Sequence, residues 1–97
     1  MARMDGTTTV DRREDCYVLL DGDEEVVVLA FEPVDEGVVA LTHTVTREDR
    51  QGEGLAGRLV GAVLDDLRER GLHLRPDCAY VASYLEEHPD QQELIAR

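Results

Sequence analysis

Two glycines lie where a predicted loop leads into a predicted helix, a place where backbone amides can bind an anion. The segment reads Gln51-Gly52-Glu53-Gly54-Leu55-Ala56. The first amides of a helix have no partner within the helix, and the helix dipole is positive at that end. Without Cβ atoms, Gly52 and Gly54 would let these amides approach the oxygens of a diphosphate. The segment is therefore predicted to bind phosphate groups, although glycines that serve only a turn would look the same.

Two arginines, Arg47 and Arg50, precede the glycines and would add flexible positive charge beside a bound anion. The segment differs from the phosphate loop of nucleotide hydrolases, because no Gly-Lys-Ser or Gly-Lys-Thr follows. Gly57 extends the glycine pattern, but the dinucleotide fingerprint belongs to a parallel sheet, and the strands before this loop are predicted to be antiparallel. Neither nucleotide-binding class therefore fits.

Two side chains outside this segment have reactive chemistry. His43 lies shortly before it, and an imidazole exchanges protons near neutral pH, so His43 could accept a proton directly or through water. Cys78 precedes a predicted helix, whose N-terminus could lower the thiol pKa and favour a nucleophilic thiolate. Each has a structural alternative, because a histidine can pack on a strand and a cysteine is often a small buried residue. No group of His and Cys residues has the spacing of a metal site.

The remaining sequence predicts the elements that position these groups. Strands are expected at Cys16–Leu20, Glu25–Phe31 and Val38–Val45, and the short turns between them predict an antiparallel meander. Alternation along the third strand places four residues on one face of the sheet, and Thr42 and Thr44 on the other. The four are Val39, Leu41, His43 and Val45.

An amphipathic helix is expected from Gly54 to Arg70, because apolar residues recur at helical spacing, and Gly71 would end it. A short strand at Leu72–Pro76 and helices at Ala79–Glu87 and Gln91–Ala96 complete the chain. A right-handed strand–helix–strand crossover would make the fourth strand parallel to the third. The predicted fold is an α/β (α+β) sandwich, with a three-strand meander followed by this crossover.

Length and composition indicate one small acidic domain. The 97 residues include no Lys and have a net charge of −12, which argues against nucleic-acid binding through a basic surface. Residues 1–15 are polar and are expected to form a flexible segment, with a single compact domain at residues 16–97. No apolar run suits a membrane span or a signal peptide, so a cytoplasmic protein with Cys16 and Cys78 reduced is expected. An exposed sheet edge would permit a monomer or a homodimer.

The segment from Gln51 to Ala56 resembles the acyl-CoA motif of the GCN5-related N-acetyltransferases, Gln/Arg-x-x-Gly-x-Gly/Ala, and agrees with it at every fixed position. Three flanking segments extend the resemblance: His43-Thr44-Val45, Pro76-Asp77-Cys78-Ala79-Tyr80-Val81 and His88-Pro89. Together they resemble the very short branch of this superfamily, from roughly Tyr17 to the C-terminus. Larger members have additional N-terminal helices that help to shape the acceptor pocket, and by this resemblance the chain is expected to lack them.

This resemblance implies a protein that binds acetyl-CoA. The third and fourth strands would splay apart, the backbone of Val45 would contact the pantetheine arm, and the amides of residues 51–56 would hold the pyrophosphate. Cys78 would lie opposite the acetyl group, either as a nucleophile or as a thiol acid. Tyr80 and Tyr84 share a helix face, and the resemblance implies that one of them protonates the CoA thiolate. Packing against the sheet is the other explanation for each tyrosine.

The leading hypothesis is an acetyl-CoA-dependent N-acetyltransferase that acts on a small-molecule or protein amine. A polyamine, an aminoglycoside and a lysine side chain suit the acidic composition equally well. One alternative is a non-catalytic acyl-CoA-binding or sensing module. Another is a small interaction domain whose glycines serve only turns, but this leaves the position of the glycines before the helix unexplained.

Overall fold

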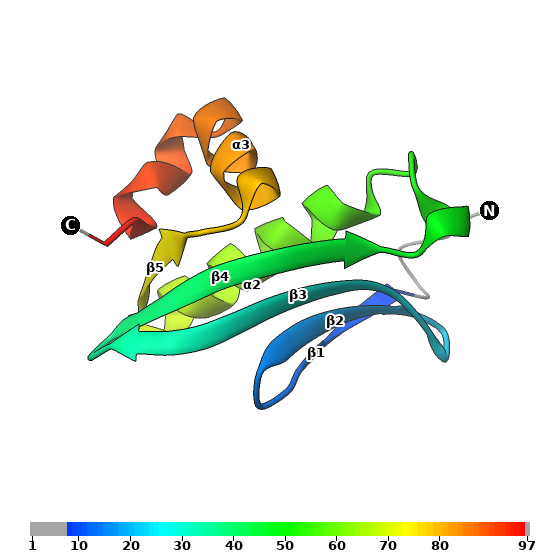
Figure 1. Cartoon of the computed structure of the whole chain (residues 1–97), viewed down its shortest axis with the longest axis horizontal. Helices are drawn as coiled ribbons and strands as arrows, with labels where there is room; N and C mark the ends of the chain where they lie inside the picture. Colours follow the sequence, from blue (N-terminus) through cyan, green and yellow to red (C-terminus); the bar gives the residue numbers. More distant parts are fainter. Residues whose placement is uncertain (1–7, 97) are drawn as a thin grey trace.

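The computed structural model describes residues 8–96. Its centre is a sheet with the strand order β1-β2-β3-β4-β5 (Figure 1). β2 (Cys16–Asp21), β3 (Glu24–Asp35) and β4 (Val38–Thr46) pair antiparallel in chain order. Their many β-branched residues favour extended backbone, and the predicted meander is confirmed.

The crossover helix α2 (Leu55–Arg70) connects β4 to β5 (His73–Pro76), and β5 pairs parallel to β4 as predicted. This pairing covers only Val38 to Leu41 of β4. Among the described strands, none pairs with the same edge of β4 from residue 42 to residue 46. We call this place the β4–β5 gap. It leaves backbone groups of β4 available to a ligand.

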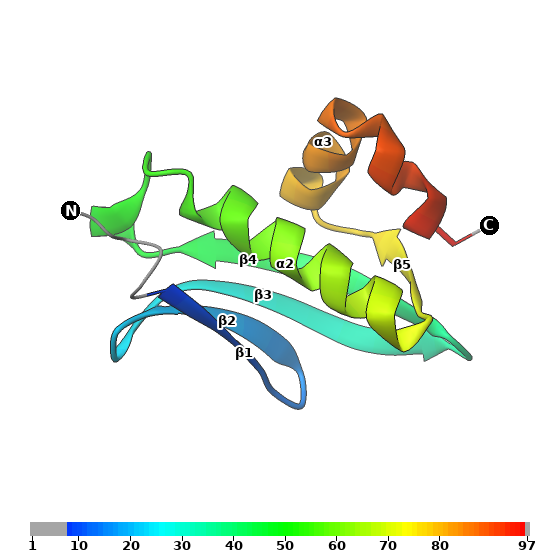
Figure 2. The same ribbon diagram turned by 180° about the vertical axis from the view of Figure 1, so that it is seen from behind.

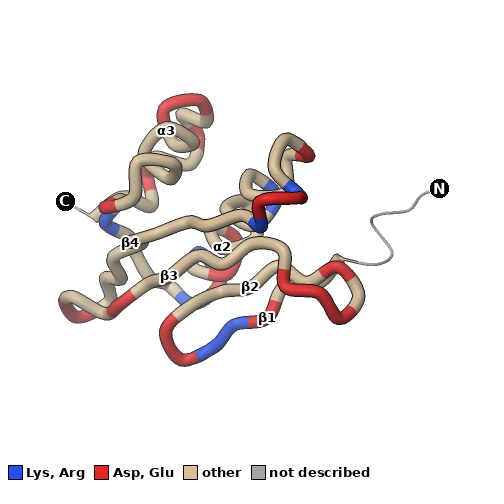
Figure 3. Tube along the Cα trace, turned by 45° about the vertical axis from the view of Figure 1, so that its right-hand side comes forward, with Lys and Arg blue, Asp and Glu red and all other residues tan. Residues whose placement is uncertain are grey.

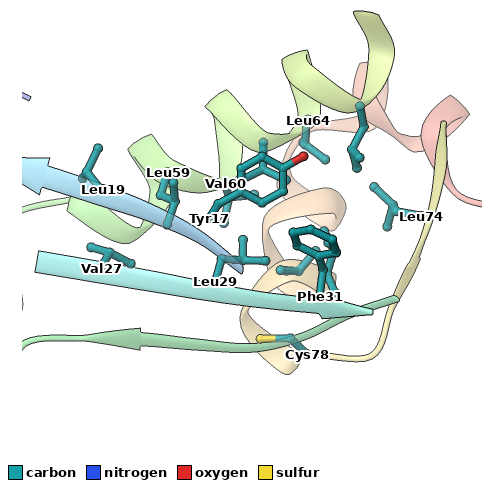
Figure 4. Close-up of a cluster of buried hydrophobic side chains, with 14 of the residues drawn as sticks. Tyr17, Leu19, Val27, Leu29, Phe31, Leu59, Val60, Leu64, Leu74 and Cys78 are labelled. Carbon is teal, nitrogen blue, oxygen red and sulfur yellow. The ribbon is translucent and has the colours of Figure 1, made fainter. Parts of the chain in front are cut away.

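One apolar core lies between the sheet and α2, which crosses one face of the sheet (Figure 2). The apolar stripe of α2 is buried as its spacing predicts: Leu55, Leu59, Val60, Val63, Leu64 and Leu67. Side chains from β2 and β3 face this stripe in the close-up of Figure 4: Tyr17, Leu19, Val27, Leu29 and Phe31.

The C-terminal elements close the same core. α3 (Ala79–Glu87) begins where the sequence predicts a helix and contributes the buried Val81 and Leu85. The helix expected at residues 91–96 is instead the 3-10 helix η2 (Pro89–Leu94), which contributes Leu94. Within residues 8–96, no helix is both long enough and apolar enough to cross a membrane.

An additional strand, β1 (Thr8–Arg12), lies within the segment that was expected to be flexible. It pairs antiparallel with β2. Its side chains are mostly exposed, so the sequence shows no apolar alternation, and backbone pairing defines the strand instead. The guanidinium of Arg12 also lies over the rings of Tyr17 and Phe31, 5.8 and 5.3 Å from their centroids. Residues 1–7 of the expected flexible segment lie outside the described residues.

An irregularity in β4 changes which side chains face the core. Ala30 pairs with His43, but the next residue, Phe31, pairs with Leu41, so β4 contains one extra residue at this β-bulge. Side-chain alternation therefore reverses beyond the bulge. The prediction that His43 and Val45 share a face with Val39 and Leu41 is wrong, since Val39 and Leu41 are buried whereas His43 is exposed and Val45 is 62% exposed.

Candidate functional site

The glycine loop, residues 47–54, connects β4 to α2. It contains the short 3-10 helix η1 (Glu48–Arg50) followed by two glycines in the left-handed region, Gly52 at φ +86° and Gly54 at φ +78°. A Cβ at either position would meet no heavy atom within 4 Å. The backbone conformation therefore requires glycine, and the space beside it is open to a ligand.

Gly54 is also the N-cap of α2, and it supplies no side-chain cap. The amides in the first turn of α2 consequently have no partner within the helix. The open space at Gly54 adjoins these amides, at the positive end of the helix dipole. This arrangement is suited to binding phosphate oxygens.

A cavity of about 270 Å³ lies against this loop. It is lined by Thr46, Arg50, Gln51, Gly52, Gly54, Leu55, Ala56 and Tyr80. The cavity therefore brings most of the predicted cofactor-binding residues together with one predicted catalytic residue, Tyr80. Glu53 and Val45 are not part of its lining. The side chain of Val45 points to the opposite face of the sheet, so Val45 could contribute only its backbone.

A slightly larger hollow of about 310 Å³ lies between β1 and α2. Its lining includes the carboxylates of Asp65, Asp66 and Glu69, which would repel a phosphate group. Volume alone therefore does not identify the anion site, and the smaller cavity beside the glycine loop fits the diphosphate better.

Arg50 is placed differently from the flexible cation that the sequence predicted. Its guanidinium contacts the carboxylates of Asp21 at 2.9 Å, Glu24 at 3.2 Å and Glu53 at 3.1 Å, and its side chain is 17% exposed. Hydrogen bonds to Glu53 and then Asp21 raise the pKa of Arg50, so it stays charged. Through these ion pairs, Arg50 links the glycine loop to the turn between β2 and β3.

Arg47 is also paired, with Glu24 and with Asp49. The charges of both arginines are thus largely offset by carboxylates. The backbone amides, rather than the arginine side chains, are the main groups available to an anion here. Glu53 could contribute only its amide, because its carboxylate holds Arg50.

Cys78 is the N-cap of α3, and its side chain is 9% exposed. Its sulfur lies 3.3 Å from the hydroxyl oxygen of Thr44 on β4, beside the β4–β5 gap. Burial raises the pKa of the thiol, but the Thr44 hydroxyl and the backbone N–H groups of Val81, Tyr80 and Thr44 outweigh it and leave the pKa below its ordinary value. The N–H groups at the start of α3 thus act on the thiol pKa in the predicted direction, and Thr44 is a further partner that the sequence does not reveal.

His43 does not lie beside Cys78. It is adjacent to Thr44 in β4, and neighbouring strand residues point to opposite faces of a sheet. Because Thr44 contacts Cys78 on the core side, the exposed His43 projects from the other face. The two predicted catalytic groups could act on one ligand only across the β4–β5 gap.

The two tyrosines of α3 have different surroundings. Tyr80 is 43% exposed and lines the cavity. Tyr84 is half-buried, its ring stacks on His88 with 4.0 Å between ring centroids, and burial is the main cause that raises the pKa of its hydroxyl. Only Tyr80 therefore faces the place predicted for the cofactor.

Two glycines of α2 make room for these tyrosines. A Cβ on Gly57 would lie 3.4 Å from the Tyr80 hydroxyl oxygen, and one on Gly61 would lie 3.2 Å from that of Tyr84. This role for Gly57 and Gly61 was not among the sequence-based predictions. The signal was present, because both the glycines and the tyrosines are four residues apart, so each pair lies on one helix face.

The profile of the GCN5-related N-acetyltransferase family matches residues 16–94. The chain belongs to this family. The human protein NATD1 is 35% identical over 83 residues, which cover 86% of this chain and 74% of NATD1. NATD1 proteins from cattle and chicken are each 34% identical over the same length, covering 86% of this chain and 74% and 76% of the relatives.

Solved structures confirm the fold of the GCN5-related N-acetyltransferases. A GCN5-like protein from Staphylococcus aureus superimposes with a TM-score of 0.73 at 20% identity, covering 93% of this chain and 89% of that one. The ribosomal-protein-S18-alanine N-acetyltransferase of Escherichia coli gives 0.61 at 20% identity, covering 78% and 53%. The resemblance seen in residues 51–56 and their flanks is therefore confirmed at the level of family and fold, and an acetyltransferase is the activity that the family supports.

Proposed function

We propose that the protein is an acetyl-CoA-dependent N-acetyltransferase. The observation that carries this proposal is the position of the open glycine loop next to the β4–β5 gap, with Cys78 at the far side of the gap. Left-handed Gly52 and Gly54 leave free space in front of the first amides of α2, as a diphosphate requires. The residues present thus fit coenzyme A, whose thioester supplies an activated acetyl group.

Each part of the site has a distinct task in this proposal. The amides of the glycine loop and of the first turn of α2 hold the pyrophosphate. The unpaired edge of β4, including the backbone of Val45, hydrogen-bonds the amides of the pantetheine arm. Tyr80 borders the cavity from α3 and would donate a proton to the CoA thiolate.

Cys78 has two conceivable roles, nucleophile or thiol acid. A thiol whose pKa is lowered is more often deprotonated near neutral pH, and a thiolate has no proton to donate. The lowered pKa therefore supports the nucleophilic role. His43 would take a proton from the acceptor amine on the exposed side of the sheet, either directly or through water.

A binding experiment followed by a product screen tests this function. Isothermal titration calorimetry should detect binding of acetyl-CoA, and the ligand should raise the melting temperature because it binds only the folded state. Mass spectrometry after incubation with acetyl-CoA and a panel of polyamines, aminoglycosides and lysine peptides should then reveal an acetylated product. Absence of both heat and thermal shift would exclude the proposal.

A non-catalytic acyl-CoA-binding module is the second candidate. The observation that favours it is the placement of His43 and Cys78 on opposite faces of the sheet. His43→Gln and Cys78→Ala distinguish the two candidates, with Cys16→Ala as a cysteine control outside the gap. Loss of turnover in both site variants, with unchanged affinity for acetyl-CoA, supports the enzyme, whereas binding without any product in the unmodified protein supports the module.

A further inference from the structure

The contact between Thr44 and Cys78 depends on the irregularity of β4. Without the bulge, Thr44 would lie on the same face as Thr42 and opposite to Leu41. The extra residue reverses the alternation, so Thr44 turns towards the core and its hydroxyl oxygen comes within 3.3 Å of the Cys78 sulfur. A β-bulge next to a functional site often redirects a side chain in this way.

The contact also joins the two sides of the β4–β5 gap. Thr44 belongs to β4, beyond the last residue that pairs with β5, and Cys78 lies between β5 and α3. The two residues are 34 positions apart in the sequence. A hydroxyl at this point can therefore fix the direction of the thiol relative to the edge of β4.

We propose that Thr44 is a positioning residue for Cys78. The Thr44 hydroxyl donates a hydrogen bond to the Cys78 sulfur and holds the sulfur at the β4–β5 gap. This inference rests on the proposed function as far as acetyl transfer is concerned. The effect of the contact on the ionisation of the Cys78 thiol, in contrast, can be measured without a substrate. A hydroxyl that donates to sulfur stabilises the thiolate over the thiol.

Other charged groups around Cys78 are already paired or lie elsewhere. Arg75 and Asp77, which precede it, form an ion pair of 2.8 Å with each other. His43 of β4 projects from the opposite face, and Tyr80 of α3 faces the cavity. On α2, the uncharged Gly57 and Gly61 lie against the hydroxyls of Tyr80 and Tyr84, and the charged Asp65 acts on Tyr84. Burial, which raises the thiol pKa, and hydrogen bonds to the sulfur, which lower it, therefore set the ionisation of Cys78, rather than neighbouring charges.

The test measures the ionisation of Cys78 in three variants: Thr44→Val, Thr44→Ser and the control Thr42→Val. All carry Cys16→Ser, so that Cys78 is the only thiol, and its Cβ carbon-13 shift is followed by NMR as pH is raised. Thr44→Val keeps the shape of the side chain but removes the donor, and we expect the thiol pKa to rise by about one unit, the size of one lost hydrogen bond to a charged group. Thr44→Val removes only part of the stabilisation of the thiolate, since the backbone N–H groups that also lower the thiol pKa remain. Thr44→Ser should restore the original titration.

Thr42→Val is the matched control. It removes a hydroxyl from the same strand, but that hydroxyl bonds the carbonyl oxygen of Ala30 at 3.3 Å and not Cys78. The Cys78 titration should be unchanged in this variant. An equal thiol pKa in Thr44→Val and in the parent, with both proteins folded by circular dichroism, would overturn the inference.

Kinetics then connect the contact to acetyl transfer. Thr44→Val should lower kcat by about tenfold or more with little change in KM for acetyl-CoA, because the sulfur is misplaced but the glycine loop is intact. A raised thiol pKa in a protein without any transferase activity would support the Thr44 contact and reject the proposed function. An unchanged thiol pKa in an active enzyme would reject the Thr44 contact and support the proposed function.

Discussion

Tyr80 and Tyr84 show how strongly local surroundings separate two identical side chains. They lie one turn apart on α3, and each has its hydroxyl near a glycine of α2. Tyr80 borders the cavity beside the glycine loop, whereas Tyr84 stacks on His88, whose Nδ1 lies 2.7 Å from the Tyr84 carbonyl oxygen. Tyr84 is thus held in a packed position, and Tyr80 is accessible to a ligand.

A pair of matched variants tests this difference. Tyr80→Phe should lower kcat by about 100-fold, the contribution of one general acid, because the hydroxyl next to the cavity is lost. Tyr84→Phe should keep kcat close to the unmodified value. Steady-state kinetics with acetyl-CoA and an identified amine measure both. Equal kcat values in the two variants would contradict the assignment of Tyr80.

At the scale of elements, the glycine loop works through backbone conformation. Gly54 has φ +78° at the start of α2, and Gly37 has nearly the same φ, +73°, in the turn between β3 and β4. Neither has a heavy atom within 4 Å of an added Cβ. Strain should therefore be similar at both positions, whereas only Gly54 lies beside the cavity.

Gly54→Ala and Gly37→Ala separate folding from binding. Each should destabilise the protein by about 1 kcal/mol, because a residue with Cβ is strained in the left-handed region. Only Gly54→Ala should weaken acetyl-CoA binding, since its methyl group enters the space for the phosphates. Urea denaturation and calorimetry measure the two effects. A similar loss of acetyl-CoA affinity in Gly37→Ala would show that the loop acts only through overall stability.

A second element contact joins the sheet to α2. The Tyr17 hydroxyl of β2 donates to the Asp66 carboxylate of α2 at 2.7 Å, and Arg70 donates to the same carboxylate at 2.8 Å. Burial raises the pKa of Asp66, but Tyr17, Arg70 and Arg12 outweigh it, so the pKa is lower than usual. Asp66 therefore stabilises the folded protein in its ionised form.

The sign of the pH dependence follows from this direction. A lowered carboxyl pKa adds stability at pH values above the unfolded pKa of about 3.9, and this is lost as pH falls through the folded pKa. Asp66→Asn should therefore be less stable than the parent at neutral pH, and the difference should shrink in acid. Tyr17→Phe should cost about 1 kcal/mol at neutral pH. Urea denaturation across the acid range checks both, and a pH-independent difference for Asp66→Asn would contradict the argument.

The sequence predicted the elements well where apolar periodicity was strong. The meander, the crossover helix and the start of α3 follow from β-branched runs and helical spacing. β1 was missed because its exposed, polar side chains carry no such pattern. The face of His43 was predicted wrongly because a bulge is a property of the paired strands, and the amino-acid sequence of β4 alone does not show it.

The candidate site was predictable only in part, for a related reason. Residues 51–56 carry a local motif, so the position of the glycine loop directly before α2 was predicted correctly. The partners of Arg50 were not, since Asp21 and Glu24 are 29 and 26 residues away in the sequence. Thr44 was also overlooked, because its contact with Cys78 exists only after the bulge and the crossover have formed.

At the scale of the whole molecule, acidic residues occur in many separate parts of the chain. Figure 3 shows Asp and Glu in the turns, in the glycine loop and along the helices. Several arginines are paired with carboxylates, including Arg47, Arg50, Arg70 and Arg75. The net charge of −12 therefore leaves an excess of negative charge on a molecule only 41 × 28 × 23 Å in extent. Such an excess repels itself and also repels an anionic ligand at long range.

Salt should consequently strengthen both folding and acetyl-CoA binding. Raising NaCl from about 0.05 M to about 0.5 M shortens the screening length to a few ångströms, which reduces repulsion between surface charges more than it weakens contacts inside the cavity. The many exposed ion pairs add little stability individually, so their screening should not reverse the effect. We expect a higher melting temperature and a lower Kd for acetyl-CoA at the higher salt concentration. Dephospho-CoA, which carries less charge, should show a smaller change in Kd. A Kd that rises steeply with salt would mean that arginine side chains, rather than the amides of the glycine loop and α2, hold the phosphates.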